Sequence, residues 1–197
     1  MSQPTTIYLV RHGQTLWNIE KRFQGHSDSP LTETGRNQAI GAGQKLADRP
    51  LSHAYASPSP RTMETARLVL GKRNLTITQE PRLREIYLGP LEGVTYDDAL
   101  KSHPKAAKAF WERPHLFNVE GAENAQQVQT RVVESLGEIA KAHPGESLLV
   151  VSHGVAIKTA LAWFMGHDIS KLHEVALPEN GSITTLTLSN GSWNVQR

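Results

Sequence analysis

The sequence predicts an α/β fold: a three-layer sandwich with a mostly parallel central sheet, an antiparallel C-terminal edge strand and helices on both faces. Two apolar, β-branched runs, residues 7–10 and 148–151, are typical of buried strands, and each leads into a His-Gly pair. Because parallel strands end at one edge of a sheet, we expect His12 and His153 to lie at the same carboxyl edge, where open α/β sheets bind ligands.

Short alternating or β-branched runs predict the other strands, and turn-forming residues bound them. These strands are expected at residues 53–57, 75–78, 175–177, 183–188 and 193–195. Asn190 and Gly191 predict a hairpin turn between the last two, since this dipeptide readily adopts the left-handed backbone that such turns need. The C-terminal part of the sheet is therefore expected to be antiparallel.

Apolar residues at helical spacing predict the helices. They are expected to begin near Thr32, Pro60, Tyr96, Asn124 and Val155. The second helix carries Arg61 in its first turn, and Pro104 interrupts the third pattern, which predicts two short helices there. Polar or proline-bounded composition predicts loops at residues 14–30 and 113–118 and leaves residues 82–89 undecided between strand and loop.

The chain has 197 residues, about the size of one domain that buries roughly 70% of its unfolded surface. It contains no cysteine, which removes disulfides and thiolate metal ligands. Residues 1–5 lack the basic region of a signal peptide, and the apolar run after them is too short to cross a membrane, so we expect a cytoplasmic protein. The net charge of +2 favours neither nucleic acid nor membrane partners.

The residues at the two strand ends suit phosphoryl transfer without a metal ion. This reaction needs a nucleophile, cations on the phosphoryl oxygens and a proton for the leaving oxygen. His12 can be the nucleophile, since an ordinary imidazole is mostly unprotonated at neutral pH. Arg11 and Arg61 can each donate a pair of charge-assisted hydrogen bonds, and an anion would relieve the unfavourable charge of Arg61 at a helix N-terminus.

Each of these residues taken alone has an ordinary structural interpretation. A histidine at a strand end is usually a rim residue, a lone arginine at a helix start is usually solvated, and Glu85 by itself is a surface carboxylate. The repeated strand-His-Gly pattern, with Arg11 before the first copy, is what favours catalysis. The remaining histidines show no spacing typical of a metal site and are interpreted as scattered, solvated or structural: His26, His53, His103, His143, His167 and His173.

Four blocks of the sequence carry a resemblance to a known family. They are Arg11-His12-Gly13 with Thr15, Trp17-Asn18 and Gln24-Gly25; Ser57-Pro58 through Arg61 to Thr65-Ala66; Leu83-Arg84-Glu85 with Gly89 and Glu92-Gly93; and Ser152-His153-Gly154. In this order they resemble the histidine phosphatase superfamily, specifically its phosphoglycerate mutase-like branch. The resemblance spans nearly the whole chain and implies a single domain over residues 1–197, with a cap-like insertion around residues 90–120.

The resemblance implies a role for each matching residue. His12 would be the phosphorylated nucleophile, Glu85 the proton donor to the leaving group, and Arg11, Arg61 and a protonated His153 the phosphate pocket. Further contacts to the phosphate are implied for Gly13, Asn18, Gln24, Gly25 and Gly154. The implied reaction has two displacements: His12 takes the phosphoryl group and releases an alcohol, and Glu85 then directs water at phosphorus. No metal or other cofactor is expected.

The same site can return the phosphoryl group to a sugar acid, as a mutase does, or transfer it to water, as a phosphatase does. Mutases of the family supply a lysine and an arginine pair from an inserted segment, but residues 101–118 here contain no adjacent arginines. Val155 stands where the cofactor-dependent mutases have asparagine. We therefore favour a phosphatase, with phosphoglycerate mutase as the alternative and a catalytically idle phospho-ligand binding protein as a further one.

The substrate is expected to be a small phosphorylated metabolite, such as phosphoglycerate or phosphoserine. Trp111, Arg113 and His115 lie in the segment that the resemblance places over the active site, so they are expected to influence substrate choice. The apolar strand expected at residues 175–177 could also serve a homodimer formed edge to edge.

Overall fold

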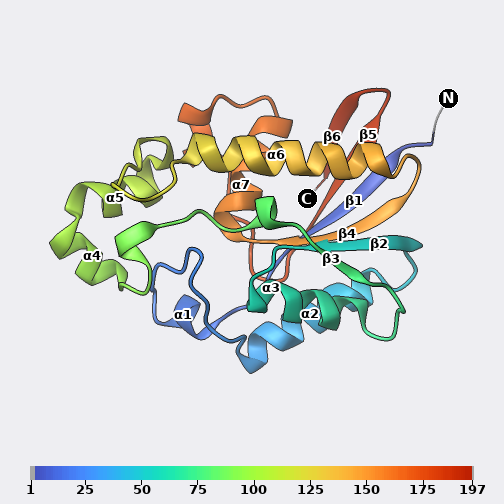
Figure 1. Ribbon diagram of the computed structural model, residues 1–197, viewed down its shortest axis with the longest axis horizontal. Coiled ribbons are helices and arrows are strands. Elements are labelled where there is room, and N and C mark those ends of the chain that lie inside the picture. Colours follow the sequence, from blue (N-terminus) through green and yellow to red (C-terminus); the bar gives the residue numbers. More distant parts are fainter. Residues whose placement is uncertain (1–2, 197) are drawn as a thin grey trace.

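One six-stranded sheet runs through the computed structural model, which describes residues 3–196 (Figure 1). The strands are β1 (Thr5–Arg11), β2 (Leu51–Ala56), β3 (Ile77–Gln79), β4 (Ser147–Ser152), β5 (Ile183–Ser189) and β6 (Ser192–Gln196). Their order is β3-β2-β4-β1-β5-β6. The first four strands pair in parallel, whereas β5 is antiparallel to both β1 and β6. The predicted mostly parallel sheet with an antiparallel C-terminal edge is confirmed.

Helices cover both faces of this sheet. On one face lie α2 (Glu33–Lys45) and α3 (Pro60–Leu70), and on the other lie α6 (Ala125–Ala142) and α7 (Gly154–Phe164) (Figure 1). Shorter helices are α1 (Leu16–Ile19), α4 (Tyr96–Ser102) and α5 (Pro104–Glu112), and 3₁₀ turns are η1 (Pro81–Leu83), η2 (Gly89–Leu91), η3 (Pro114–Leu116) and η4 (Ile169–Glu174). No helix within residues 3–196 is long and apolar enough to cross a membrane.

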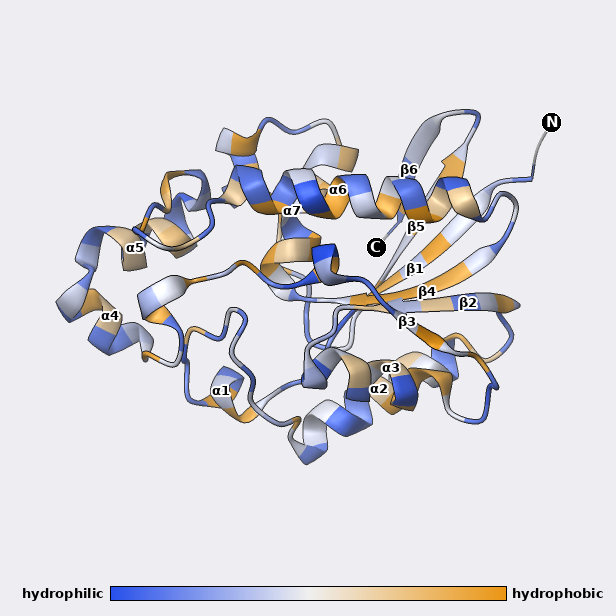
Figure 2. Ribbon diagram, viewed as in Figure 1, coloured by the Kyte–Doolittle hydropathy of each residue, from blue (hydrophilic) through white to orange (hydrophobic). Residues whose placement is uncertain are grey.

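Successive side chains of the central strands point to opposite faces of the sheet. They form two hydrophobic cores, one on each face. On β1, Ile7 and Leu9 pack in the core that α6 and α7 cover, whereas Tyr8 and Val10 pack with α2 and α3. β4 alternates in the same way beside it. Figure 2 shows both strands as strongly apolar in the middle of the sheet. Because both of their faces are buried, these strands show continuous apolar runs in the sequence.

The prediction of a strand at residues 175–177 is wrong. These residues follow η4, and the amide of Val175 donates to the carbonyl of Leu172 rather than to a neighbouring strand. Val175 is buried in the core with α6 and α7, so its apolar character reflects burial after a 3₁₀ turn. The edge strands of the sheet are β3 and β6, and a homodimer formed through residues 175–177 loses its structural basis.

Smaller differences concern turns and short helices. β3 begins at Ile77, two positions later than expected. The loop predicted at residues 14–30 contains α1, where Thr15 and Asn18 form a capping box. The loop predicted at residues 113–118 contains η3, and the undecided segment 82–89 is an irregular stretch between η1 and η2. The two short helices divided before Pro104 are confirmed.

Two glycines let the loop after β1 lie directly against α2. A β-carbon at Gly13 would lie 2.2 Å from the carbonyl oxygen of Gly35, and one at Gly35 would lie 2.1 Å from the carbonyl oxygen of Gln14. Both neighbours are backbone atoms, which cannot rotate away as a side chain can. The loop that follows the nucleophile candidate is therefore fixed by a contact that only glycine permits.

Gly35→Ala is expected to lower the free energy of unfolding by about 1–3 kcal/mol, because the methyl group must push the loop after β1 away from α2. Gly41→Ala is the matched control in the same helix, since no atom would lie within 4 Å of its β-carbon. Alanine there should stabilise the helix by roughly 0.5–1 kcal/mol. Urea unfolding measures both variants, and equal destabilisation by the two would contradict the close contact.

Candidate active site

His12 and His153 meet at the carboxyl edge of the sheet, as predicted. His12 follows directly after β1 and His153 directly after β4, and these neighbouring strands end in register, with Arg11 opposite Ser152. The centroids of the two imidazole rings lie 5.3 Å apart. Both side chains are buried, with relative exposures of 3% for His12 and 0% for His153. Strand pairing thus unites two His-Gly pairs that are far apart in the sequence.

The ring of His12 is held in one orientation and one protonation state. Its Nδ1 lies 2.8 Å from the carbonyl oxygen of Gly13, an acceptor that places the hydrogen on Nδ1 and leaves the lone pair on Nε2. Burial lowers the pKa of His12 well below its usual range, and the charges of Arg61 and Arg11 lower it further. His12 is therefore neutral at neutral pH, in the form in which Nε2 is nucleophilic.

Arg61 lies in the first turn of α3, as predicted, and is only 1% exposed. Its Nη1 donates to the carbonyl of Ser27 and to Oδ1 of Asp28, both at 2.8 Å, and its Nη2 donates to the carbonyl of Gly25 at 2.8 Å. Asp28 supplies a counter-charge that the sequence analysis expected from a ligand. Arg61 therefore fixes the loop around Gly25, a residue that lines the pocket around His12.

Three buried nitrogen atoms around His12 have no hydrogen-bond partner within residues 3–196. They are Nε of Arg11, Nε of Arg61 and Nδ1 of His153. The other end of Arg11 is held by the carbonyl of Pro178, which accepts from Nη1 at 2.6 Å. Since buried polar groups almost always have partners, three unpartnered nitrogens beside one imidazole indicate a site for a ligand with several acceptor oxygens.

His153 is anchored from the opposite side of its ring. Its Nε2 lies 2.7 Å from Oγ of Ser57, so Nδ1 can carry the hydrogen when the Ser57 hydroxyl donates to Nε2. Burial lowers the pKa of His153 well below its usual range, with the charge of Arg61 next in size. The protein alone favours neutral His153, and the proton expected there requires the negative charge of a bound anion.

Glu85 lines the same pocket as His12, and the start of α7 orients its carboxylate. Oε1 accepts from the amides of Ile86 and Ala156, both at 3.0 Å, and Oε2 accepts from the amide of Val155 at 3.1 Å. Backbone donors at a helix N-terminus stabilise a negatively charged carboxylate and restrict its rotation. The helix that follows His153 thus positions the proposed acid on the far side of the pocket.

Arg131 holds the backbone of Glu85, although no motif in the sequence marks it. This α6 side chain donates to the carbonyls of Arg82, Arg84 and Glu85 at 2.7, 2.6 and 2.9 Å. Glu123 accepts from its Nε and Nη2, both at 2.8 Å. In the sequence, only its position beside the apolar face of α6 distinguishes Arg131 from a solvated surface arginine.

Glu92 orders the opposite wall of the pocket. Its Oε1 accepts from the amide of His26 at 2.7 Å, and its Oε2 accepts from the amide and hydroxyl of Ser27 at 2.9 and 2.6 Å. Gly25 has a left-handed backbone with φ of 56°, and a β-carbon there would lie 2.2 Å from Oε1 of Glu92. The predicted contact at Gly25 therefore depends on glycine and on two charged residues, Glu92 and Arg61, that hold its loop.

Asn18 and Gln24 both line the pocket, but their side chains also bond within the protein. Oδ1 of Asn18 accepts from the amide of Thr15 at 3.1 Å and from Nδ2 of Asn180 at 3.3 Å. Nε2 of Gln24 donates to Oγ1 of Thr15 at 3.3 Å. Nδ2 of Asn180 also donates to the carbonyl of His12, which makes it a further residue that sequence reasoning missed.

Gly13 and Gly154, the two other glycines predicted to contact the phosphate, lie next to His12 and Arg11. The amide of Gly13 donates to Oγ1 of Thr65 at 3.1 Å, which directs it toward α3 rather than toward the pocket. A β-carbon at Gly154 would lie 3.2 Å from Cζ of Arg11. Gly154 therefore leaves space for the guanidinium, and a larger residue would displace it.

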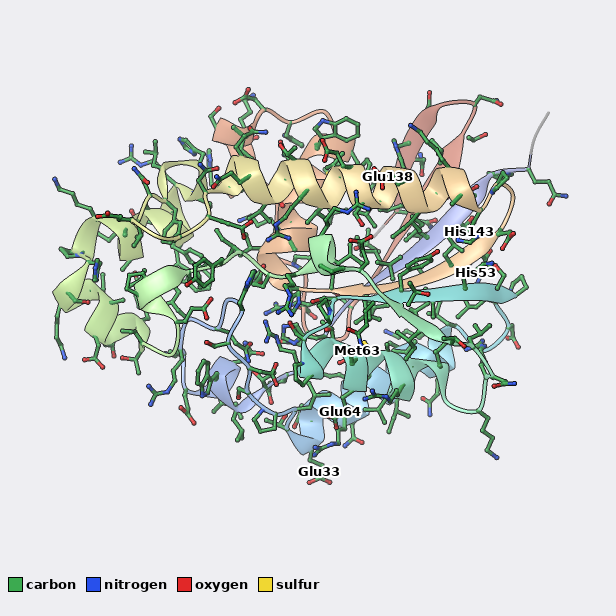
Figure 3. All side chains as sticks on the ribbon, viewed as in Figure 1. Glu33, His53, Met63, Glu64, Glu138 and His143 are labelled. Carbon is green, nitrogen blue, oxygen red and sulfur yellow. The ribbon has the colours of Figure 1, made fainter. Side chains whose placement is uncertain are left out.

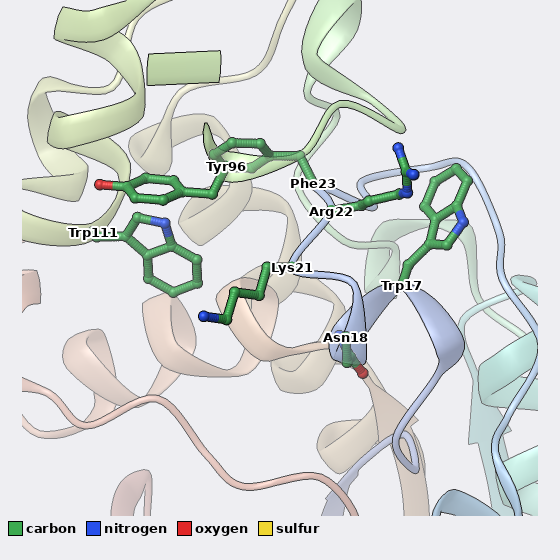
Figure 4. A pocket seen from close by; sticks show the side chains of 7 residues that line it. All are labelled: Trp17, Asn18, Lys21, Arg22, Phe23, Tyr96 and Trp111. Carbon is green, nitrogen blue, oxygen red and sulfur yellow. The ribbon is translucent and has the colours of Figure 1, made fainter. Parts of the chain in front are cut away.

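The pocket around His12 has a volume of about 90 Å³ and adjoins a larger recess of about 400 Å³. The recess is lined by Trp17, Asn18, Lys21, Arg22, Phe23, Tyr96 and Trp111 (Figure 4). Residues common to both are Asn18, Arg22, Phe23 and Trp111. An ester can therefore place its phosphoryl group at His12 and its alcohol portion among aromatic rings.

Of the three residues expected to influence substrate choice, Trp111 lines both the pocket and the recess. His115 instead lines a separate hollow with Leu116 and Ile169, and Arg113 is exposed. The segment expected to form a cap thus reaches the candidate site through two aromatic residues of α5, Phe110 and Trp111.

A group of potential metal ligands lies near the amino ends of the parallel strands, at the opposite end of these strands from His12. It consists of His53, His143 and Glu146, which lie at or beside the amino ends of β2 and β4. The interpretation of the remaining histidines as scattered is wrong for this pair, because the ring centroids of His53 and His143 lie 3.9 Å apart. Only the pairing of β2 with β4, which no local spacing reveals, brings them together.

Comparison with known proteins agrees with the four sequence blocks. The model of the histidine phosphatase superfamily, branch 1, matches residues 7–197. The chain is 34% identical to the probable phosphoglycerate mutase GpmB of Yersinia pestis (strain Pestoides F), over 95% of this chain and 86% of that protein.

Two solved structures illustrate the range of similar proteins. Bacillus stearothermophilus YhfR matches with a TM-score of 0.94 and 41% identity, covering 97% of this chain and 95% of that one. A mycobacterial glucosyl-3-phosphoglycerate phosphatase matches with a TM-score of 0.88 and 26% identity, covering 99% and 98%. Proteins named as mutases and proteins named as phosphatases are thus both similar to this one. The chain belongs to the histidine phosphatase superfamily, branch 1, and to its phosphoglycerate mutase-like group.

Proposed function

We propose that this protein is a metal-independent phosphatase that hydrolyses small phosphomonoesters through a phosphohistidine on His12. One observation carries the proposal: a buried, neutral imidazole with a free Nε2 lies among the unpartnered nitrogens of Arg11, Arg61 and His153. This combination offers a nucleophile and cationic donors for the same phosphoryl group.

In the first displacement, Nε2 of His12 forms a bond to phosphorus while the bond from phosphorus to the ester oxygen breaks. Glu85 gives its proton to the departing oxygen, so that an alcohol leaves. Arg11 and Arg61 donate to the equatorial oxygens of the phosphoryl group, where charge must be stabilised in the transition state. A well-placed arginine of this kind contributes on the order of 10³–10⁵ in rate.

In the second displacement, Glu85 accepts a proton from water, the water oxygen bonds to phosphorus and the bond to Nε2 breaks. His12 regains its lone pair and inorganic phosphate leaves. The three backbone amides around the Glu85 carboxylate hold it in one orientation for both proton transfers.

The residues beside the pocket favour water over a sugar acid as the acceptor. Val155 lines the pocket with an apolar side chain, which offers no donor to a second phosphate. Lys101, in the segment from which family mutases supply cations, is exposed and pairs with Asp98 at 2.9 Å. Phosphoglycerate mutase remains the alternative because similar proteins such as GpmB carry that name.

The recess beside the pocket supports a substrate with an apolar or planar alcohol portion. Trp17, Tyr96 and Trp111 provide aromatic faces there, and Figure 4 shows the Lys21 ammonium group in the space beneath Trp111. Aromatic side chains bury large areas of apolar ligand surface. We therefore expect turnover to improve as the alcohol portion fills this recess.

Incubation of purified protein with chelator and separate phosphoserine, phosphoglycerate and aryl phosphate substrates is expected to release inorganic phosphate without isomerising phosphoglycerate. His12→Ala should reduce this release on the order of 10³-fold or more, because the covalent route is lost. His103→Ala, at an exposed position, is the matched control and should retain the rate. The assay follows free phosphate and isomerised product, with and without a bisphosphate primer.

Isomerisation without phosphate release would show that the protein is a mutase and not a phosphatase. Binding of inorganic phosphate without turnover of any ester would instead identify an idle phospho-ligand binding protein. Loss of activity in chelator that added metal restores would contradict the metal-independent mechanism.

Arg131→Lys keeps the positive charge but loses the planar group that reaches three carbonyls around Glu85. We expect kcat to fall by about 10–100-fold, because Glu85 shifts relative to the leaving oxygen. Inhibition by inorganic phosphate should change little, since Arg131 lies behind Glu85. Arg36→Lys, in an exposed ion pair with Glu64, is the control and should leave both quantities unchanged. Equal losses of phosphate affinity and kcat in Arg131→Lys would contradict this positioning role.

A further inference from the structure

Three side chains with metal-binding atoms meet at the edge of the sheet opposite to His12. His53 belongs to β2, His143 follows α6 directly and Glu146 precedes β4 directly. Oε2 of Glu146 lies 3.1 Å from Nε2 of His53 and 3.9 Å from Nδ1 of His143. One ligand atom from each residue lies within 4.8 Å of the others. Figure 3 labels the two histidines next to each other at this end of the sheet.

An irregularity in β2 creates this arrangement. The register of β2 against β4 shifts between Leu51 and His53, so Ser52 is an extra residue in the ladder. Such bulges redirect side chains and are frequent beside functional sites. The hydroxyl of Ser52 donates to Oε2 of Glu146 at 2.6 Å, which fixes the carboxylate beside the two imidazoles.

Like Ser52, Tyr55 lies outside the group of three potential ligands, and it orients His143. Its Nε2 lies 2.7 Å from the hydroxyl oxygen of Tyr55. When Nε2 donates its hydrogen to that oxygen, the lone pair of the ring lies on Nδ1, the atom nearest to Glu146. Histidines that bind metals usually donate their other ring N–H to such a partner. A simple ion pair between His53 and Glu146 would not involve His143. The contact between Tyr55 and His143 is therefore better explained by a site that includes all three residues.

The chemistry of the three ligand atoms indicates the kind of cation. Two imidazoles with one carboxylate suit zinc and related transition metals, whereas magnesium and calcium prefer oxygen ligands only.

We propose that His53, His143 and Glu146 form a three-ligand site for a zinc-type divalent cation, with water in the remaining coordination position. Zinc bonds of about 2.0–2.1 Å in a tetrahedron place ligand atoms roughly 3.4 Å apart, so separations that reach at most 4.8 Å must close by up to about 1.4 Å. His53 and Glu146 have the freedom for this, since their side chains are 44% and 39% exposed.

The cation would link the end of α6 to β2 and β4, and its effect would be on stability. β4 has six residues, about 20 Å of strand, and this length separates the site from the edge that carries His12. Bound zinc is therefore expected to raise the unfolding temperature without changing phosphatase activity.

The test uses tag-free protein stripped with chelator and then titrated with zinc by calorimetry, and with cobalt(II) followed by visible absorption. We expect one ion per chain and a higher unfolding temperature with zinc but not with magnesium. His53→Gln and His143→Gln should each weaken zinc binding by at least about 100-fold, and Tyr55→Phe by about 10-fold. His103→Gln removes an exposed histidine elsewhere and should bind zinc as the unaltered protein does.

Unchanged far-ultraviolet circular dichroism and unchanged activity would show that each variant remains folded. The proposal is overturned if the unaltered protein binds no zinc, if His143→Gln binds it with unchanged affinity, or if His103→Gln weakens binding as much as His53→Gln. Equal stabilisation by magnesium would also overturn it.

Discussion

The register of β1 against β4 is the constraint on which the site depends. With Arg11 opposite Ser152, both strands end together, and the amide of His12 donates to the carbonyl of Ser152 at 3.0 Å. A slip of one residue would turn the strand residues to the opposite faces of the sheet and exchange the two cores. Because both faces are packed with apolar side chains, this register is strongly specified, and it brings the ring centroids of His12 and His153 within 5.3 Å of each other.

Around this pair, one set of charges serves both reactivity and binding. Burial lowers the pKa of His12 most, the charges of Arg61 and Arg11 lower it further, and in the proposed reaction both arginines also bind the phosphoryl group. Burying two cations together is unfavourable, and Asp28 and Glu85 offset part of that cost through their negative charges. Glu85 in turn depends on Arg131, so the pocket is a network in which few side chains act alone.

The main features of the fold and the positions of His12 and His153 could be predicted because they follow from local patterns, whereas the role expected for Glu85 came only from the family resemblance. Strands buried on both faces give continuous apolar runs, and the two histidines come directly after the ends of those strands. Arg131 escaped prediction, and Glu92 was noted only as part of a family block with no role assigned, because both act through contacts between segments distant in the sequence, which leave no periodic signal. The apolar run at residues 175–177 was wrongly predicted to be a strand because burial after a 3₁₀ turn favours the same apolar residues as a strand does. His53 and His143 meet only through strand pairing and a bulge.

In the proposed reaction, the phosphoryl group passes through Nε2 of His12. The most direct measurement stops turnover of a phosphate-labelled ester in alkali within the first catalytic cycle and locates the label by peptide mapping. We expect an acid-labile label on the peptide that contains His12, formed and lost fast enough to explain the rate of turnover. Release of phosphate at the full rate with no labelled protein at any time, or a label on another residue, would contradict it.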